Sequence, residues 1–163
     1  MDDFEKLYGR VGDAGFDAKY EASCHCGRVR YQVSADPVDA KICHCVMCRK
    51  LHGAPMQWAV IFHKHHVRFV AGVGELRFYN GALDKPERML PCKLSCRQCG
   101  SPIADEGRTM WLGFPPLFDF GTPPTIPQAF RPRCHIFYAS RVLDMDDGLP
   151  KWAGHAEESE RLG

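Results

Sequence analysis

The feature that most constrains this chain is the spacing of its nine cysteines. Most of them fall into three short groups, which are Cys24 with Cys26, Cys43 with Cys45 and Cys48, and Cys96 with Cys99. In a reducing compartment, thiols two or three residues apart are more typical of metal ligands than of disulfides. The cysteine pattern therefore predicts a small fold organised around bound zinc.

The first and last groups supply two pairs of thiols from distant parts of the chain, as structural zinc sites commonly do. Gly27 and Gly100 follow these pairs and can relieve backbone strain where the chain turns round a metal. We therefore predict a closed structural zinc site with four ligands, Cys24, Cys26, Cys96 and Cys99. The alternative is that these thiols are small buried apolar residues, as free cysteines often are.

The middle group places three thiols close together, and catalytic zinc typically has three protein ligands and an open fourth position. We therefore predict a second, catalytic zinc site with three ligands, Cys43, Cys45 and Cys48. The alternative is a fourth protein ligand from His44, Cys92 or Cys134, which would close the site and make it structural. Cys92 and Cys134 lie in or beside expected strands, which favours a core position for both.

Three thiolates carry more negative charge than a zinc dication neutralises, so such a site acidifies water poorly. This ligand set argues against a hydrolase and favours a soft fourth ligand, for which a substrate thiol is the natural choice. A bound thiol loses its proton yet can add to a carbonyl carbon, which is carbon–sulfur bond formation or its reverse. Four nearby side chains can hold the carboxylates or amides of a thiol such as glutathione, or can be solvated surface: Arg49, Lys50, His52 and Gln57.

Short segments that alternate apolar and polar residues between Gly, Pro, Asn and Asp turns predict a mainly β fold with mostly antiparallel sheet. Helix is expected only as a short turn over Val46 to Leu51, directly after a pair of cysteines. The expected strands are Val29 to Val33, Gln57 to Phe62, Val67 to Val70, Leu76 to Tyr79, Arg88 to Ser95, Met110 to Leu112 and His135 to Tyr138.

A chain of 163 residues has the size of one domain with a single core. We expect a loosely ordered leader over residues 1–19, a zinc-binding β domain over 20–153 and a charged tail over 154–163. Six prolines and several phenylalanines lie between Pro115 and Pro132, and they predict a loop packed over the sheet.

The charge balance argues against polyanionic partners, because 21 Lys and Arg face 20 Asp and Glu. We therefore expect no binding to nucleic acid or to a membrane. The acidic start of the chain and the absence of a long apolar run predict a soluble, cytoplasmic protein. The histidines between His63 and His66 are expected to form a solvated turn.

The chain contains a set of short motifs: Ser23 to Gly27 with Val29 and Tyr31, Cys43 to Arg49, Gly53 to Pro55, Cys96 to Ser101, Arg131 with Pro132, His135 with Ile136, and Asp147 to Pro150. Together these motifs resemble the glutathione-dependent formaldehyde-activating enzyme and centromere protein V family. The resemblance implies a tent-like β fold around a structural zinc on the four paired cysteines. It also implies a second zinc on the middle group, where glutathione is joined to formaldehyde to give S-hydroxymethylglutathione.

The interpretation is a two-zinc carbon–sulfur lyase or synthase that acts on a glutathione-like thiol and a small aldehyde such as formaldehyde. Two alternatives come from other classes of protein. One is a non-catalytic two-zinc scaffold or interaction module, and the other is a zinc-thiolate redox sensor that uses Cys48 or Cys92. The sequence does not predict the oligomeric state.

Overall fold

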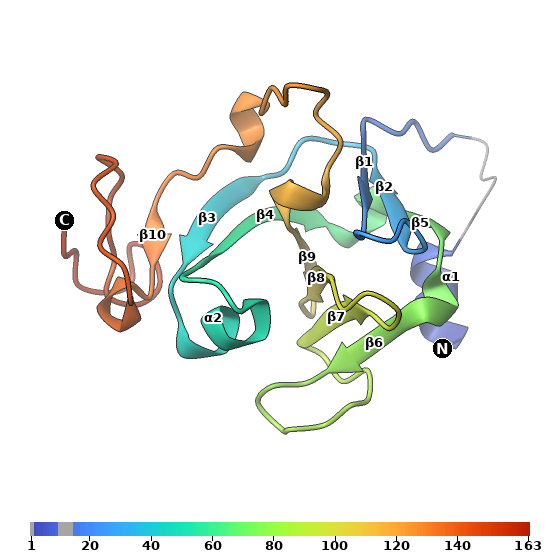
Figure 1. The fold of residues 1–163 in the computed structure, drawn as a ribbon, viewed down its shortest axis with the longest axis horizontal. Coiled ribbons are helices and arrows are strands. Elements are labelled where there is room, and N and C mark those ends of the chain that lie inside the picture. Colours follow the sequence, from blue (N-terminus) through green and yellow to red (C-terminus); the bar gives the residue numbers. More distant parts are fainter. Residues whose placement is uncertain (1, 10–14) are drawn as a thin grey trace.

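The computed structural model describes residues 2–9 and 15–163, and most of its regular structure is β-strand in two sheets (Figure 1). The smaller sheet has the order β1-β2-β5, with β1 at Tyr20–Ser23, β2 at Arg30–Val33 and β5 at Val67–Ala71. The larger sheet has the order β10-β3-β4-β9-β8-β7-β6. Its strands are β3 (Asp39–Cys43), β4 (Gln57–His63), β6 (Leu76–Tyr79), β7 (Cys92–Cys96), β8 (Pro102–Glu106), β9 (Met110–Gly113) and β10 (His135–Ile136).

The mainly β prediction is confirmed, and the described strands pair antiparallel except β10 with β3, which run parallel. The expected strand from Arg88 starts later, at Cys92, because Pro91 has no N–H to donate to a ladder. The expected strand from His135 ends at Ile136, because Phe137 adopts a left-handed φ of 52°. The sequence pattern did not indicate β1, β3 and β8, which are short and held by their neighbours in the sheets.

The described α-helices are α1 (Asp2–Tyr8) and α2 (Val46–His52), and α2 matches the expected helical turn. Cys45 caps the start of α2 by accepting a hydrogen bond from the backbone N–H of Cys48. Gly53 ends the helix in a left-handed conformation, with φ at 58°. Short 3-10 helices cover Lys64–His66, Val73–Glu75, Pro115–Leu117, Gln128–Phe130 and Tyr138–Ser140.

The expected loosely ordered leader is wrong for its first part, because residues 2–8 form α1. Phe4 and Tyr8 lie one helical turn apart and are 0 % and 1 % exposed. The ring of Phe4 lies 5.3 Å from that of Phe69, and the ring of Tyr8 lies 5.1 Å from that of Trp111. Burial of two large aromatic side chains is what orders such a short helix. The leader positions 1 and 10–14 lie outside the described residues.

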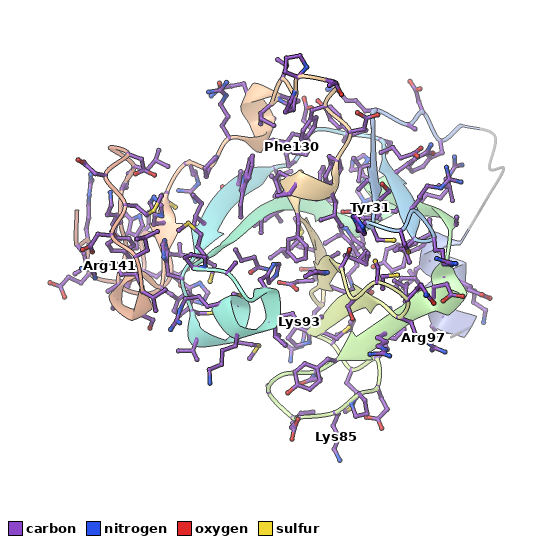
Figure 2. All side chains as sticks on the ribbon, viewed as in Figure 1. Tyr31, Lys85, Lys93, Arg97, Phe130 and Arg141 are labelled. Atoms are coloured by element: carbon purple, nitrogen blue, oxygen red, sulfur yellow. The ribbon has the colours of Figure 1, made fainter. Side chains whose placement is uncertain are left out.

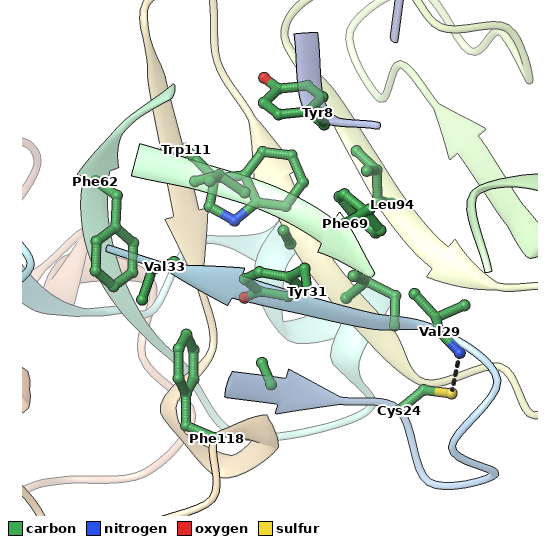
Figure 3. Packing of buried hydrophobic residues seen from close by; sticks show 14 of the residues in the cluster. Tyr8, Cys24, Val29, Tyr31, Val33, Phe62, Phe69, Leu94, Trp111 and Phe118 are labelled. Carbon is green, nitrogen blue, oxygen red and sulfur yellow. Dashed lines mark hydrogen bonds between the residues drawn. The ribbon is translucent and has the colours of Figure 1, made fainter. Parts of the chain in front are cut away.

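Aromatic rings join the two sheets in the core (Figure 3). Tyr31 of the small sheet lies 5.5 Å from Trp111 of the large sheet, ring centre to ring centre. Phe69 packs against both rings, at 5.5 and 5.8 Å. Phe118, from the proline-rich segment, closes the cluster at 5.7 Å from Tyr31. The expectation that this segment packs over the sheet is therefore confirmed.

One carboxylate, that of Glu106, is buried beside this core with no exposed surface. It accepts hydrogen bonds from the Tyr8 hydroxyl at 2.8 Å, from the Arg88 guanidinium at 2.6 and 2.8 Å and from the Lys64 ammonium at 3.2 Å. Burial alone would raise the pKa of Glu106, but hydrogen bonds from Arg88 and Tyr8 hold it below its ordinary value. The Glu106 carboxylate therefore stays charged, and its hydrogen bond from Tyr8 links α1 to β8.

The expected charged tail folds back onto the chain before it. Backbone hydrogen bonds join Lys151 to Gly163 and Ala153 to Glu160, and Trp152 forms a β-bridge with Arg161.

Among the described residues, no helix combines the length and the apolar character needed to span a membrane.

Candidate metal centres

The four paired thiols converge where the two sheets meet. Cys24 and Cys26 lie in the turn from β1 to β2, and Cys96 ends β7, with Cys99 in the turn that follows. All four sulfur atoms lie within 4.8 Å of one another. Gly27 and Gly100 have φ values of 75° and 76°, so each turn uses a backbone conformation that favours glycine. Four soft donors this close together could hold one metal ion, and the donor type fits zinc.

Hydrogen bonds support the sulfur atoms of this cluster. The backbone N–H of Val29 donates to Cys24 Sγ at 3.3 Å (Figure 3), and Ser101 Oγ lies 3.2 Å from Cys99 Sγ. Hydrogen bonding with Ser101 lowers the pKa of Cys99 to about 5, whereas burial raises that of Cys96 to about 11. None of the nine cysteines forms a disulfide. The thiols therefore remain available as ligands, and thiolate formation is already favoured at one of them.

The three thiols of the middle group converge at the start of α2. Cys43 ends β3, Cys45 caps the helix and Cys48 lies in its first turn, with the three sulfur atoms within 4.8 Å of one another. Cys43 and Cys48 are 9 % and 6 % exposed. Within the described part of the chain, no fourth Cys, His, Asp or Glu joins this group. The donor set fits a zinc ion with three protein ligands.

The side chains considered as a possible fourth ligand, His44, Cys92 and Cys134, lie elsewhere. His44 Nε2 lies 2.8 Å from Nδ1 of His135 and is fully buried. Cys92 Sγ lies 3.9 Å from Glu106 in the core, and burial raises the pKa of Cys92 to about 12. Cys134 is 1 % exposed and belongs to neither cluster. The core positions expected for Cys92 and Cys134 are thus confirmed.

Lys93 contacts the three-thiol cluster, and none of the sequence motifs indicated it. Its ammonium lies 3.7 Å from Cys48 Sγ and donates to Asp105 Oδ2 at 2.6 Å. Gln57 Nε2 donates to the same carboxylate oxygen at 2.7 Å. Figure 2 shows Lys93 on the sheet beside α2. Burial opposes the charge, but Asp105 and Cys48 together raise the pKa of Lys93.

The four side chains expected to hold a thiol substrate have different surroundings. Arg49 Nε donates to the backbone oxygen of His44 at 3.1 Å, so it supports the cysteine loop. The imidazole of His52 lies 4.7 Å from the ring of Phe114, and Gln57 is buried against Asp105. Lys50 is exposed. A signal for Lys93 was present in the alternation of β7, because Lys93 must face away from the buried Cys92 and Leu94.

Comparison with known proteins agrees with this geometry. A family model described as glutathione-dependent formaldehyde-activating enzyme matches residues 19–140, a range that contains both cysteine clusters. A crystal structure of a Rhodobacter sphaeroides protein has the same fold, with a TM-score of 0.51 and 23 % identity over 63 % of this chain and 91 % of that chain. No curated protein matches the chain significantly. On the extent of the family match, the chain belongs to the glutathione-dependent formaldehyde-activating enzyme family.

Proposed function

We propose that this protein is a zinc-dependent carbon–sulfur lyase or synthase that joins a glutathione-like thiol to a small aldehyde such as formaldehyde. The product is an S-hydroxymethyl adduct. The observation that carries the proposal is the three-thiol cluster at the start of α2, which gains no fourth ligand from the described residues. Membership of a family named for glutathione-dependent formaldehyde activation supports the same reaction.

Two zinc ions per chain are proposed, with different roles. The structural ion would be held by Cys24, Cys26, Cys96 and Cys99, which link the β1–β2 turn of one sheet to β7 of the other. Its binding free energy would count directly toward folding, since such a site does not exist in the unfolded chain. The reactive ion would be held by Cys43, Cys45 and Cys48.

A zinc ion on three thiolates would supply a Lewis acid that keeps a substrate thiol deprotonated and nucleophilic. In the forward direction a sulfur lone pair forms the S–C bond to the aldehyde carbon. The C=O π electrons pass to the oxygen, which takes up a proton from solvent. The reverse reaction breaks the S–C bond and restores the carbonyl, so no oxidant or reductant is needed.

The ammonium of Lys93 is the cation that we propose to stabilise the negative charge developing on the aldehyde oxygen. It contacts Cys48 Sγ at 3.7 Å, and Asp105, itself bonded to Gln57, holds it in place. A fixed cation in a partly buried site stabilises developing negative charge more strongly than water does. We assign this electrostatic role to Lys93. Arg49 holds the cysteine loop through the backbone oxygen of His44.

The test compares single Cys→Ser variants by metal analysis and by thiol-dependent formaldehyde consumption. Cys43→Ser should stay folded, lose one zinc and lose activity, whereas Cys24→Ser should lose the structural zinc and unfold more easily. Cys134→Ser is the matched control, because Cys134 is buried outside both clusters, and it should keep both ions and full activity.

Two results would contradict the proposal. Unchanged activity in Cys43→Ser would mean that the three-thiol cluster takes no part in the reaction. Wild-type protein with two bound zinc ions that never accelerates adduct formation between any thiol and aldehyde would favour the non-catalytic scaffold.

A further inference from the structure

A small cavity of about 260 Å³ lies beside the three-thiol cluster, between α2 and the large sheet. Lys93, Asp105 and Leu112 occupy adjacent positions on β7, β8 and β9, because Lys93 pairs with Asp105 and Asp105 pairs with Leu112. They share one face of the sheet and form one wall of the cavity. Met47, next to Cys48 in α2, lines the opposite side.

The loop after β6 completes the cavity. Gly81, Ala82 and Pro91 line it, and the Met47 side chain lies against Gly81 so closely that a Cβ there would come within 2.6 Å of the Met47 sulfur. Met47 remains 39 % exposed, and Ala82 and Pro91 are exposed as well, so the cavity opens to solvent. A ligand can therefore enter without unfolding the loop.

The lining is apolar except at one end. The side chains of Met47, Ala82, Pro91 and Leu112 offer no hydrogen-bonding group. Three charged side chains line the cavity: Lys93, Asp105 and Glu106. Lys93 and Asp105 already form an ion pair at 2.6 Å, and Glu106 is already paired with cations that do not line the cavity. A carboxylate of a peptide such as glutathione would find no unpaired cation among these lining residues. A cavity of this kind favours an uncharged, apolar group over a charged one.

Lys93 connects this cavity to the thiols. It lines the cavity, and its ammonium lies 3.7 Å from Cys48 Sγ. Two of its three hydrogens serve Asp105 and Cys48, which leaves one to bond a carbonyl oxygen. A molecule whose apolar chain fills the cavity can thus place its carbonyl group against Lys93. Only the Lys93 side chain then separates that carbonyl from the thiol cluster.

From this geometry we infer that the cavity binds the apolar chain of an aldehyde substrate, with the carbonyl oxygen toward Lys93. The inference rests on the proposed function and narrows it. The preferred aldehyde carries a short hydrocarbon chain, and formaldehyde leaves the cavity unfilled. The thiol partner approaches the cluster from outside the cavity.

Binding is measured first, without turnover. Butyramide has the length and carbonyl of butanal but does not react with thiols, and ligand-observed NMR reports its contact with the zinc-loaded protein. We expect butyramide to bind wild-type protein and not Ala82→Trp, whose new indole fills the cavity. Leu83→Trp is the matched control, because Leu83 is 55 % exposed and does not line the cavity. It should bind butyramide as wild type does.

Turnover is measured second, as the acceleration over the uncatalysed reaction of the same thiol and aldehyde. Each buried methylene contributes roughly 0.8 kcal/mol, or about fourfold. Butanal should therefore be accelerated more than formaldehyde, by up to about 60-fold for three added methylenes. Ala82→Trp should lose this advantage, and Leu83→Trp should keep it.

The outcomes separate this inference from the proposed function. If formaldehyde is turned over but butanal has no advantage, or if Ala82→Trp binds butyramide as well as Leu83→Trp does, the cavity assignment is wrong and the proposed function stands. If butyramide binds in the cavity but no aldehyde forms an adduct faster than in buffer, the assignment to an aldehyde substrate falls together with the proposed function.

Discussion

The imidazole Nε2 of His44 lies 2.8 Å from Nδ1 of His135, between the loop of the three-thiol cluster and the C-terminal part of the chain. Both rings are fully buried. On its far side His135 Nε2 lies 2.8 Å from Asp147 Oδ2. A carboxylate only accepts hydrogen bonds, so His135 donates from Nε2, and in the neutral pair its Nδ1 accepts from His44. Asp147 thus sets the tautomer of both rings and the orientation of the residue between Cys43 and Cys45.

Asp147→Asn should weaken the hydrogen bonds that link Asp147, His135 and His44, because an amide can donate to His135 Nε2 and so reverse the direction of both bonds. We expect the free energy of unfolding to fall by about 1–3 kcal/mol. Zinc should also pass faster from the three-thiol site to a chelator. Asp144→Asn is the control, since Asp144 is 84 % exposed. Equal denaturation midpoints and equal zinc release for the two variants would contradict the positioning role.

Tyr8→Phe tests whether α1 is part of the folded core. The change keeps the buried ring but removes the hydroxyl that donates to Glu106 at 2.8 Å. A lost hydrogen bond to a buried charged group should cost about 1.5–3 kcal/mol in unfolding free energy. Tyr20→Phe removes a similar bond to Asp36, but in an exposed position, and should cost clearly less. Chemical denaturation of both variants decides the point, and equal losses would argue against an anchored helix.

Glu106 should make stability depend on pH in the acid range. Its pKa is held below the ordinary value of 4.5, so between these two values the unfolded chain binds more protons than the folded one. The stabilisation is complete above the ordinary pKa and is lost as the pH falls through the folded-state value. The difference in unfolding free energy between wild type and Glu106→Gln should therefore shrink below about pH 4.5. Acid release of zinc affects both proteins and cancels in this difference. A difference in unfolding free energy that stays constant with pH would contradict the role assigned to Glu106.

Lys93→Ala should slow thiol-dependent aldehyde consumption by about 100-fold, the effect typical of removing one fixed group that stabilises developing charge. Lys93→Arg should recover part of the rate, because it restores a cation beside Cys48 and Asp105. Lys85→Ala is the control at an exposed position (Figure 2) and should react as wild type does. Metal analysis of each variant checks that both sites stay loaded. Full activity in Lys93→Ala with both ions bound would rule out the electrostatic role.

Much of the site was predictable from local sequence. Ligands of one ion within a turn are neighbours in the chain, so the spacing of Cys43, Cys45 and Cys48 was enough to indicate their cluster. Alternation of apolar and polar residues likewise indicated several strands, among them Gln57 to Phe62, which the structure contains as Gln57–His63. The glycine after each cysteine pair marked turns whose positive φ the structure contains, as at Gly27.

Other features depended on contacts between residues far apart in the chain. Phe4 and Tyr8 are held in place by aromatic rings on distant strands. A seven-residue helix has too little periodicity for the sequence pattern to indicate it. The position of Lys93 at the thiols follows from the register of β7 against β8 and from the packing of α2 on that sheet.

The sequence by itself determined which thiols form the two clusters, because ligand type and local spacing are properties of short segments. Only the tertiary structure decided that His44 and Cys92 turn away from the three-thiol cluster, and that a cation and an apolar cavity lie beside it. The physical reason is that a side chain's neighbours across a sheet are set by strand register and packing, which local pattern does not encode.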